Sequence, residues 1–155
     1  MEYFQSHDWA VLMNPKSMGQ CAGIALKVLR RMARPVAMVC GPLTTGSGRY
    51  ARNLVRLRFA VVKLRRRGIS VFDSSIFEES IRQFAKGATP QERSLYAFQN
   101  FYGLILRTGR IRKLYFLPDW EKSVGAVWMR RCARRLGLAI EDVEEGFFPE
   151  PKSSA

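Results

Sequence analysis

Glycine, hydroxyl and basic residues gather in a short segment that directly follows an apolar run of strand length. Residues 41–49 read Gly-Pro-Leu-Thr-Thr-Gly-Ser-Gly-Arg, after the apolar run at 36–40. Glycines let backbone N–H groups approach an anion closely, and the start of the next helix adds positive potential. The spacing matches neither the dinucleotide fingerprint nor the P-loop, so a polar turn that binds nothing is the alternative. The residues predicted to bind phosphate are Gly41, Thr44, Thr45, Gly46, Ser47 and Arg49, with Ser123 from a second segment.

That second segment runs from residue 117 to 126 and reads Leu-Pro-Asp-Trp-Glu-Lys-Ser-Val-Gly-Ala. It follows another apolar run and opens a helix, where Ser123 can cap the helix or donate to a phosphate. Asp119 and Glu121 are its carboxylates. Stabilising the helix start is the default interpretation of both, and a catalytic role is the alternative.

The order of these segments resembles the nucleoside 2-deoxyribosyltransferase superfamily. Within it, the likeness is to a small bacterial and phage branch related to deoxynucleoside 5′-monophosphate N-glycosidases. The shared order is a strand, the motif Gly-Pro-Leu-Thr, a long helix and then the motif Leu-Pro-x-Trp-Glu-x-Ser-x-Gly-Ala. The resemblance covers residues 36–142. It implies a Rossmann-like domain, commonly dimeric, that cleaves or exchanges the N-glycosidic bond of a nucleoside or nucleoside monophosphate. No cofactor is expected.

The sequence departs from this family at the reacting centre. The position of the family's carboxylate nucleophile holds Met129, a tyrosine position holds Met38, and an aspartate position falls on Arg112. Met38, Trp120 and Met129 are therefore expected to line the base or sugar pocket. The first interpretation is a nucleotide-binding domain with a degenerate catalytic centre. The second is an active N-glycosidase that uses Asp119 or Glu121 instead.

Charge supports a third interpretation, a basic module that binds nucleic acid. The chain has 155 residues and a net charge of +13. Residues 1–137 hold 25 basic and 8 acidic side chains, whereas residues 138–155 hold one basic and 5 acidic side chains. A basic body favours phosphate-bearing partners, but solvated charged faces are the more common outcome. The basic runs are 65–67, 130–131 and 134–135, with Arg107, Arg110, Arg112 and Lys113 around a turn.

Apolar periodicity predicts helices that alternate with short strands. We expect an α/β fold: a Rossmann-like three-layer domain with a mostly parallel sheet flanked by helices. The expected division is an N-terminal helical extension at 1–35, the α/β domain at 36–143 and a flexible acidic tail at 144–155. Helices are predicted at 18–33, 49–67, 76–85, 91–106 and 121–136, and strands at 36–40, 69–72, 113–117 and 138–143.

Three further features limit the classes of protein to which the chain can belong. No apolar stretch approaches the roughly 20 residues of a membrane span, so no membrane association is expected. Three cysteines without CxxC spacing predict neither a zinc site nor disulfides, and they suit the cytoplasm. The long helix at 49–67 carries a second apolar strip, Val55, Phe59 and Val62. Another helix of the same chain is expected to cover it, and a homodimer is the alternative.

Overall fold

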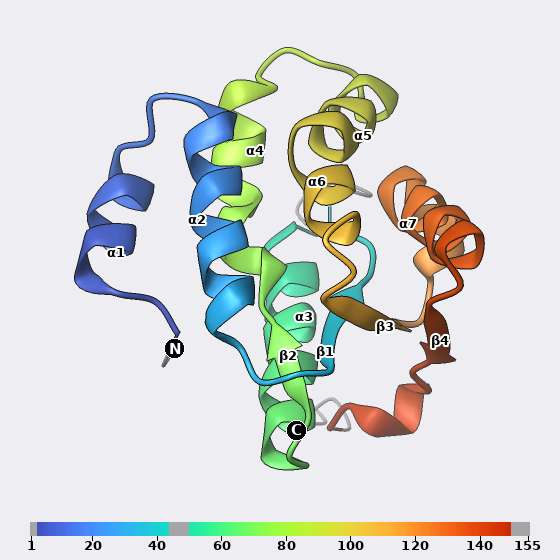
Figure 1. The fold of residues 1–155 in the computed structure, drawn as a ribbon. Helices are drawn as coiled ribbons and strands as arrows, with labels where there is room; N and C mark the ends of the chain where they lie inside the picture. Colours follow the sequence, from blue (N-terminus) through green and yellow to red (C-terminus); the bar gives the residue numbers. More distant parts are fainter. Residues whose placement is uncertain (1–2, 44–49, 150–155) are drawn as a thin grey trace, which may run out of the picture.

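The core of the fold is a parallel sheet. The computed structural model describes residues 3–43 and 50–149. Within them, four strands form one sheet in the order β2-β1-β3-β4, with every neighbouring pair parallel (Figure 1). This confirms the predicted α/β fold. The strands are β1 (Val36–Cys40), β2 (Ser70–Phe72), β3 (Ile111–Phe116) and β4 (Ala139–Asp142).

Helices cover both faces of the sheet, which explains why β1 is buried along its whole length. Alternate residues of β1 face opposite sides, so Met38 and Ala37 belong to two different apolar clusters. The Ala37 side packs against α3 (Tyr50–Arg66) through Leu57, Val61 and other residues of its apolar stripe. The Met38 side is covered by α2 (Met18–Arg31), α4 (Glu78–Phe84), α5 (Pro90–Ala97), α6 (Gly103–Leu106) and α7 (Val124–Leu136).

The stretch predicted as one helix at 91–106 contains a wider turn. Helix α5 passes through a π-helical turn, Phe98–Tyr102, before α6 begins at Gly103. A Cβ on Gly103 would lie 2.7 Å from the backbone oxygen of Phe98, so only glycine fits beneath this turn. Such turns insert an extra residue and re-aim the side chains that follow. Here the turn directs Tyr102 toward the carboxyl ends of the strands.

The N-terminal region forms more structure than the sequence indicates. Helix α1 (Ser6–Met13) lies outside α2 (Figure 1), although residues 1–16 show no apolar period. It is held by Asp8, which is 1 % exposed and accepts a hydrogen bond of 2.6 Å from Arg31 on α2. Helix α2 packs into the same core as the sheet, so the expected extension at 1–35 contributes to the main domain.

The C-terminal region also departs from the expected flexible tail at 144–155. A short 3-10 turn, Glu145–Phe147, packs on α3 with Phe148. Lys63 donates a hydrogen bond to the Phe147 carbonyl at 2.5 Å and lies 4.2 Å from its ring centre. The acidic composition of this segment predicted a loose tail. The rings of Phe147 and Phe148 nevertheless add apolar surface, and they pack on a part of α3 that does not face the sheet. Residues 150–155 lie outside the described part of the chain.

This C-terminal turn changes the interpretation of the second apolar strip on α3. Phe59 packs against Phe147 and Phe148, with ring centres 6.4 and 5.8 Å away. The expected cover, another helix, is therefore replaced by a turn of the C-terminal segment. Val55 and Val62 are not covered in this way and remain 67 % and 45 % exposed.

Candidate functional site

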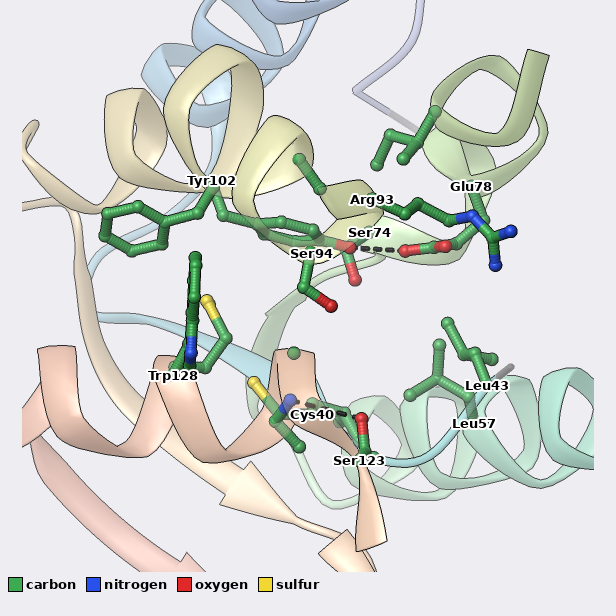
Figure 2. A pocket seen from close by; sticks show the side chains of 18 residues that line it. Cys40, Leu43, Leu57, Ser74, Glu78, Arg93, Ser94, Tyr102, Ser123 and Trp128 are labelled. Carbon is green, nitrogen blue, oxygen red and sulfur yellow. Dashed lines mark hydrogen bonds between the residues drawn. The ribbon is translucent and has the colours of Figure 1, made fainter. Parts of the chain in front are cut away.

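A cleft opens at the carboxyl ends of the strands, between α4, α5 and the π-helical turn on one side and the start of α7 on the other (Figure 2). Ligand sites of open α/β sheets form at this edge, where loops and helix starts surround a preformed floor. The end of β1 and the first residue after it form the floor. The lining residues with polar side chains are Ser74, Glu78, Arg93, Ser94, Tyr102 and Ser123.

Glu78 and Tyr102 form a hydrogen-bonded polar pair in the wall of the cleft. Glu78 opens α4 directly after β2 and its turn, and it is only 8 % exposed. The hydroxyl of Tyr102 donates a hydrogen bond to its Oε1 at 2.5 Å. Figure 2 shows this bond on the upper side of the open space, with the Arg93 side chain next to the carboxyl group. One carboxyl oxygen is thus fixed by a neutral donor.

Burial governs the proton affinity of this pair. Removal from water raises the pKa of Glu78, although the Tyr102 hydrogen bond and the positive charges of Arg82 and Arg93 oppose the rise. Burial, together with the Glu78 carboxylate, raises the pKa of Tyr102 well above its usual value. Tyr102 is therefore a neutral donor throughout the physiological range. A carboxyl group with a raised pKa in a cleft is a recurrent feature of catalytic sites.

Arg93 and Ser94 extend the same wall from α5. The Nε atom of Arg93 is buried and has no hydrogen-bond partner among the described residues. An unpaired buried guanidinium nitrogen is costly unless a ligand or water satisfies it. Arg93 is also the cationic residue among those that line the cleft, and its fork of donors suits a phosphate or a carboxylate.

The opposite wall is the start of α7. Ser123 is its N-cap and accepts a hydrogen bond from the Ala126 amide at 3.2 Å. The capping role considered for Ser123 is thus confirmed, and the residue also lines the cleft. At Gly125, an added Cβ would lie 3.6 Å from the Ser94 hydroxyl, which is an ordinary van der Waals contact, so a methyl group there would fit and fill part of the space between the two walls. The positive end of α7 faces the space between them.

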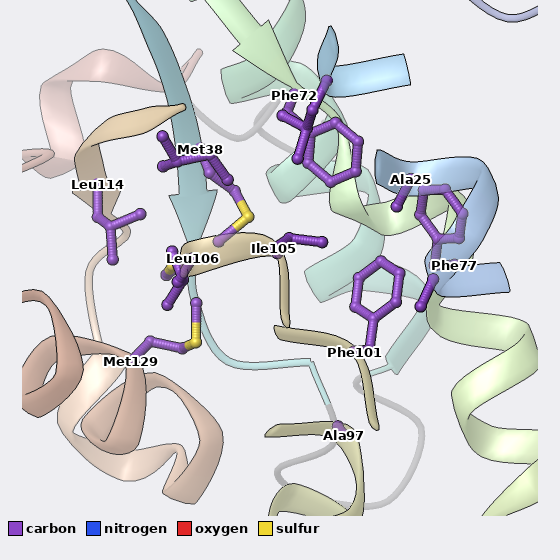
Figure 3. Packing of buried hydrophobic residues seen from close by; sticks show 14 of the residues in the cluster. Ala25, Met38, Phe72, Phe77, Ala97, Phe101, Ile105, Leu106, Leu114 and Met129 are labelled. Carbon is purple, nitrogen blue, oxygen red and sulfur yellow. The ribbon is translucent and has the colours of Figure 1, made fainter. Parts of the chain in front are cut away.

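The three residues expected around a base or sugar do not gather in one place. Met129 lines the cleft and is 6 % exposed. Met38 is fully buried beneath it, in the core of the sheet face that α2 and α6 cover (Figure 3). Trp120 packs edge-on against Phe116 and beneath Arg130, away from the lining residues.

The glycine-rich turn is only partly described. Gly41 lines the cleft, and an added Cβ there would lie 2.9 Å from Leu117, so the turn after β1 passes close to the end of β3. The predicted phosphate ligands Thr44, Thr45, Gly46, Ser47 and Arg49 lie outside the described residues.

The carboxylates considered as replacements for the family nucleophile lie outside the cleft. Asp119 adopts a left-handed backbone with φ of 67° and approaches Lys122 at 3.5 Å on the surface. It makes no capping hydrogen bond. Glu121 is exposed in the next turn. Neither is among the residues that line the cleft.

Sequence reasoning missed Glu78, Arg93 and Tyr102. Glu78 stands beside Glu79 at a helix start, where acidic residues are ordinary because of the helix dipole. Tyr102 falls on the apolar stripe of the predicted helix at 91–106 and therefore suggested core packing. The available signal was position alone: Glu78 follows β2 and the turn after it, at the carboxyl edge of the sheet, where ligands bind.

Comparison with known proteins adds no relative. The chain matches no family model, no curated protein and no solved structure. Among residues 3–43 and 50–149, no three histidine, cysteine or acidic side chains gather as a metal site requires. In the same residues, no helix is long and apolar enough to cross a bilayer.

Proposed function

We propose that the chain binds a nucleoside or nucleoside 5′-monophosphate in the cleft between α5 and α7. The resemblance of residues 36–142 to the deoxyribosyltransferase superfamily supports this ligand class. The position of the cleft at the carboxyl edge of a parallel sheet supports the location. The cleft is lined by apolar groups such as Met129 and by polar groups such as Ser94 and Ser123. This combination suits a ligand that has an apolar ring and a polar phosphate.

The phosphate would pair with Arg93 and lie near the start of α7. Arg93 Nε lacks a partner in the described structure, and an anion would satisfy it. The N-terminal amides of α7, beside Ser123, carry partial positive charge that favours the same anion. The turn at 44–49 is retained as a further phosphate contact in this proposal.

Base release is the second part of the proposal, and the buried Glu78 carboxyl carries it. A Glu78 oxygen would attack C1′ of the sugar, forming a C1′–O bond as the C1′–N bond breaks. The base would leave with the bonding electron pair and take a proton from water. A water molecule would then hydrolyse the glycosyl ester and restore the carboxylate. Tyr102, already bonded to Glu78, would hold that carboxyl in place.

This proposal replaces Asp119 and Glu121 with Glu78 as the working carboxylate. Both earlier choices are exposed, and Asp119 is close to Lys122. Glu78 has the properties that the chemistry needs: burial, a fixing hydrogen bond and a place in the wall of the cleft. The loss of the family carboxylate at Met129 is then a change of position rather than a loss of chemistry.

Titration calorimetry with a panel of deoxynucleoside 5′-monophosphates tests ligand binding. We expect Arg93→Gln to weaken binding by about 10-fold or more, since a charge-assisted hydrogen bond contributes about 1.5–3 kcal/mol. Gly125→Ala should also weaken binding, because its methyl group narrows the gap to Ser94. The same change should preserve or raise stability, since alanine is favoured over glycine within a helix by about 1 kcal/mol.

The matched controls are Lys86→Gln and Asp119→Ala, which alter an exposed cation and an exposed carboxylate outside the lining. Both should retain wild-type affinity. If no monophosphate binds the wild-type protein, or if Arg93→Gln and Gly125→Ala bind as tightly as wild type, the proposed ligand site is wrong.

A homodimer formed through α3 is also proposed, because Val55 and Val62 are exposed apolar residues on one helix face. Sedimentation equilibrium checks it. Val55→Glu should shift a wild-type dimer to monomer, whereas the neighbouring exposed change Arg52→Gln should not. A monomeric wild-type protein at micromolar concentration excludes this interface.

We propose a cytoplasmic location on the basis of the free thiols of Cys21, Cys40 and Cys132. Cell fractionation checks the location.

Burial raises the pKa of the Cys40 thiol to about 12. This residue lines the cleft, but it is therefore not a competing nucleophile at neutral pH.

A further inference from the structure

The amino-terminal edge of the sheet carries a concentration of arginine that the cleft does not use. Because the four strands are parallel, the segments that lead into them meet at one edge, opposite the cleft. Each of these four segments holds three arginines, twelve in all. They are Arg30, Arg31 and Arg34 before β1, Arg65–Arg67 before β2, Arg107, Arg110 and Arg112 around the start of β3, and Arg131, Arg134 and Arg135 before β4.

Charge is sorted along the strand direction. The same four segments, 30–35, 65–69, 107–112 and 131–138, contain no aspartate or glutamate. Acidic residues instead follow the strands, as in Asp73 after β2, Asp119 after β3 and Glu144 after β4. The net charge of the chain is therefore concentrated in the segments that lead into the strands.

Most of these guanidinium groups are available to a partner. Among the twelve, Arg31 is the one with an ion pair in the described structure, and it pairs with the buried Asp8. Arg65 donates to the backbone oxygen of Val71 at 2.7 Å. The exposed members are Arg30, Arg34, Arg66, Arg67, Arg107, Arg112, Arg131, Arg134 and Arg135.

Contacts across elements link parts of this edge. Burial raises the pKa of the Cys132 thiol, whereas the positive charges of Arg107 and Arg135 lower that pKa. Guanidinium groups from the α6–β3 turn and from the end of α7 therefore lie near one sulfur atom. Lys113, next to Arg112 on β3, pairs with Ala139 at the start of β4 in the sheet register, which brings the β3 and α7 arginines to the same corner.

The helix dipole accounts for only part of this pattern. Cations at helix C-termini are stabilised by about 0.3–1 kcal/mol each, within the last turn. Arg34, Arg110 and Arg112 lie outside helices, so the dipole gives no reason for them. Crowding the eleven arginines that have no ion pair among the described residues is unfavourable unless an anionic partner neutralises them.

We propose that this edge binds the phosphodiester backbone of nucleic acid. Every basic residue of the four segments is arginine, whose planar fork of donors matches phosphate oxygens in pairs. The segments contain no phenylalanine, tyrosine or tryptophan, so the segments themselves supply no aromatic side chain for base stacking or membrane insertion. Recognition is therefore of the backbone, without sequence preference.

Fluorescence anisotropy with a labelled DNA duplex of about 20 base pairs tests this inference. The edge variant combines Arg110→Gln, Arg112→Gln and Arg134→Gln. We expect it to bind about 10- to 100-fold more weakly near physiological salt. The slope of log K against log salt should fall by about two to three, since each phosphate contact contributes about one.

The matched control combines Lys16→Gln, Arg52→Gln and Lys86→Gln, three exposed cations outside the four segments. It removes the same charge and should bind within about twofold of wild type. Equal weakening by both triple variants overturns the proposal, because net charge alone would then explain binding. Absence of duplex binding overturns it as well.

Two further arms separate this edge from other anion sites. Saturating nucleoside monophosphate should not displace the duplex, and Glu78→Gln should bind it like wild type, since both act in the cleft. Vesicles with anionic lipid should bind more weakly than the duplex at the same salt concentration, because the four segments supply no aromatic side chain for insertion. Tight vesicle binding that the edge variant abolishes would overturn the proposal in favour of a membrane surface.

Discussion

Glu78→Gln is expected to lower the rate of base release from a deoxynucleoside monophosphate by about 1,000-fold or more. Glutamine keeps the size of the side chain and can still accept the Tyr102 hydrogen bond through its amide oxygen. It cannot supply the anionic oxygen that bonds to C1′. Removal of a nucleophile that acts in concert with its neighbours typically costs several orders of magnitude in kcat. Release is measured by chromatography of the free base under single-turnover conditions.

The neighbouring change Glu79→Gln is the matched control. Glu79 follows Glu78 on α4 but is exposed and does not line the cleft. It should release base at the wild-type rate. Wild-type release by Glu78→Gln would rule out Glu78 as the nucleophile. Loss of release in Asp119→Ala or Glu121→Ala, with Glu78→Gln active, would return the role to the segment after β3.

The stability of Glu78→Gln has a defined pH dependence. Burial raises the pKa of Glu78 in the folded protein, so the folded state binds its proton more readily than the unfolded state. The wild-type protein therefore loses stability as pH rises from the ordinary glutamate pKa, about 4.3, through the raised value. Glutamine does not ionise. Urea unfolding at neutral pH should thus find Glu78→Gln at least as stable as wild type, with the difference vanishing in acid.

The raised pKa of Glu78 also determines how the rate of base release depends on pH. Attack at C1′ needs the ionised carboxylate, so kcat/KM should rise with pH through the raised pKa of Glu78. The Tyr102 hydrogen bond lowers that pKa. Tyr102→Phe should therefore move the rising limb to higher pH, an effect that a purely structural role for Tyr102 would not produce.

The fold was predictable because its signals are local. The strand at 36–40 and the helix at 49–67 were read from unbroken apolar runs and a clear period, and the structure has β1 at Val36–Cys40 and α3 at Tyr50–Arg66. Helix α1 was not predicted, since its anchor is the contact of Asp8 with Arg31, 23 residues away. A single long-range ion pair leaves no periodic trace in a sequence.

The site was predictable only where backbone turns define it. Gly41 and Ser123 come from turns after strands, and both line the cleft. The wall that carries Glu78, Arg93 and Tyr102 depends on how α4 and α5 pack over the sheet, together with the π-helical turn before Gly103. Each of those residues also has an ordinary structural interpretation by itself. Only their spatial convergence distinguishes them.

Phe101→Ala is expected to be the most destabilising single change, at about 3–5 kcal/mol. Phe101 is fully buried beneath the cleft, with ring centres 4.8 Å from Phe77 and 5.0 Å from Tyr102 (Figure 3). Rigid aromatic neighbours cannot collapse into the space of a lost ring, so the cavity persists. Most domains have a free energy of unfolding of only 5–15 kcal/mol. Urea titration should therefore show a large fall in midpoint with an unchanged slope.

Phe59→Ala provides the comparison, since it removes the same ring from the surface of α3. Phe59 is only half-buried, and its partners Phe147 and Phe148 belong to a C-terminal turn in which they too are half-buried. We expect a loss below about 2 kcal/mol there. Because Phe101 supports the turn that presents Tyr102, Phe101→Ala should also reduce base release in protein that is still folded. A change at Phe101 no larger than at Phe59 would contradict the packing of this wall, and with it the position of the Glu78–Tyr102 pair.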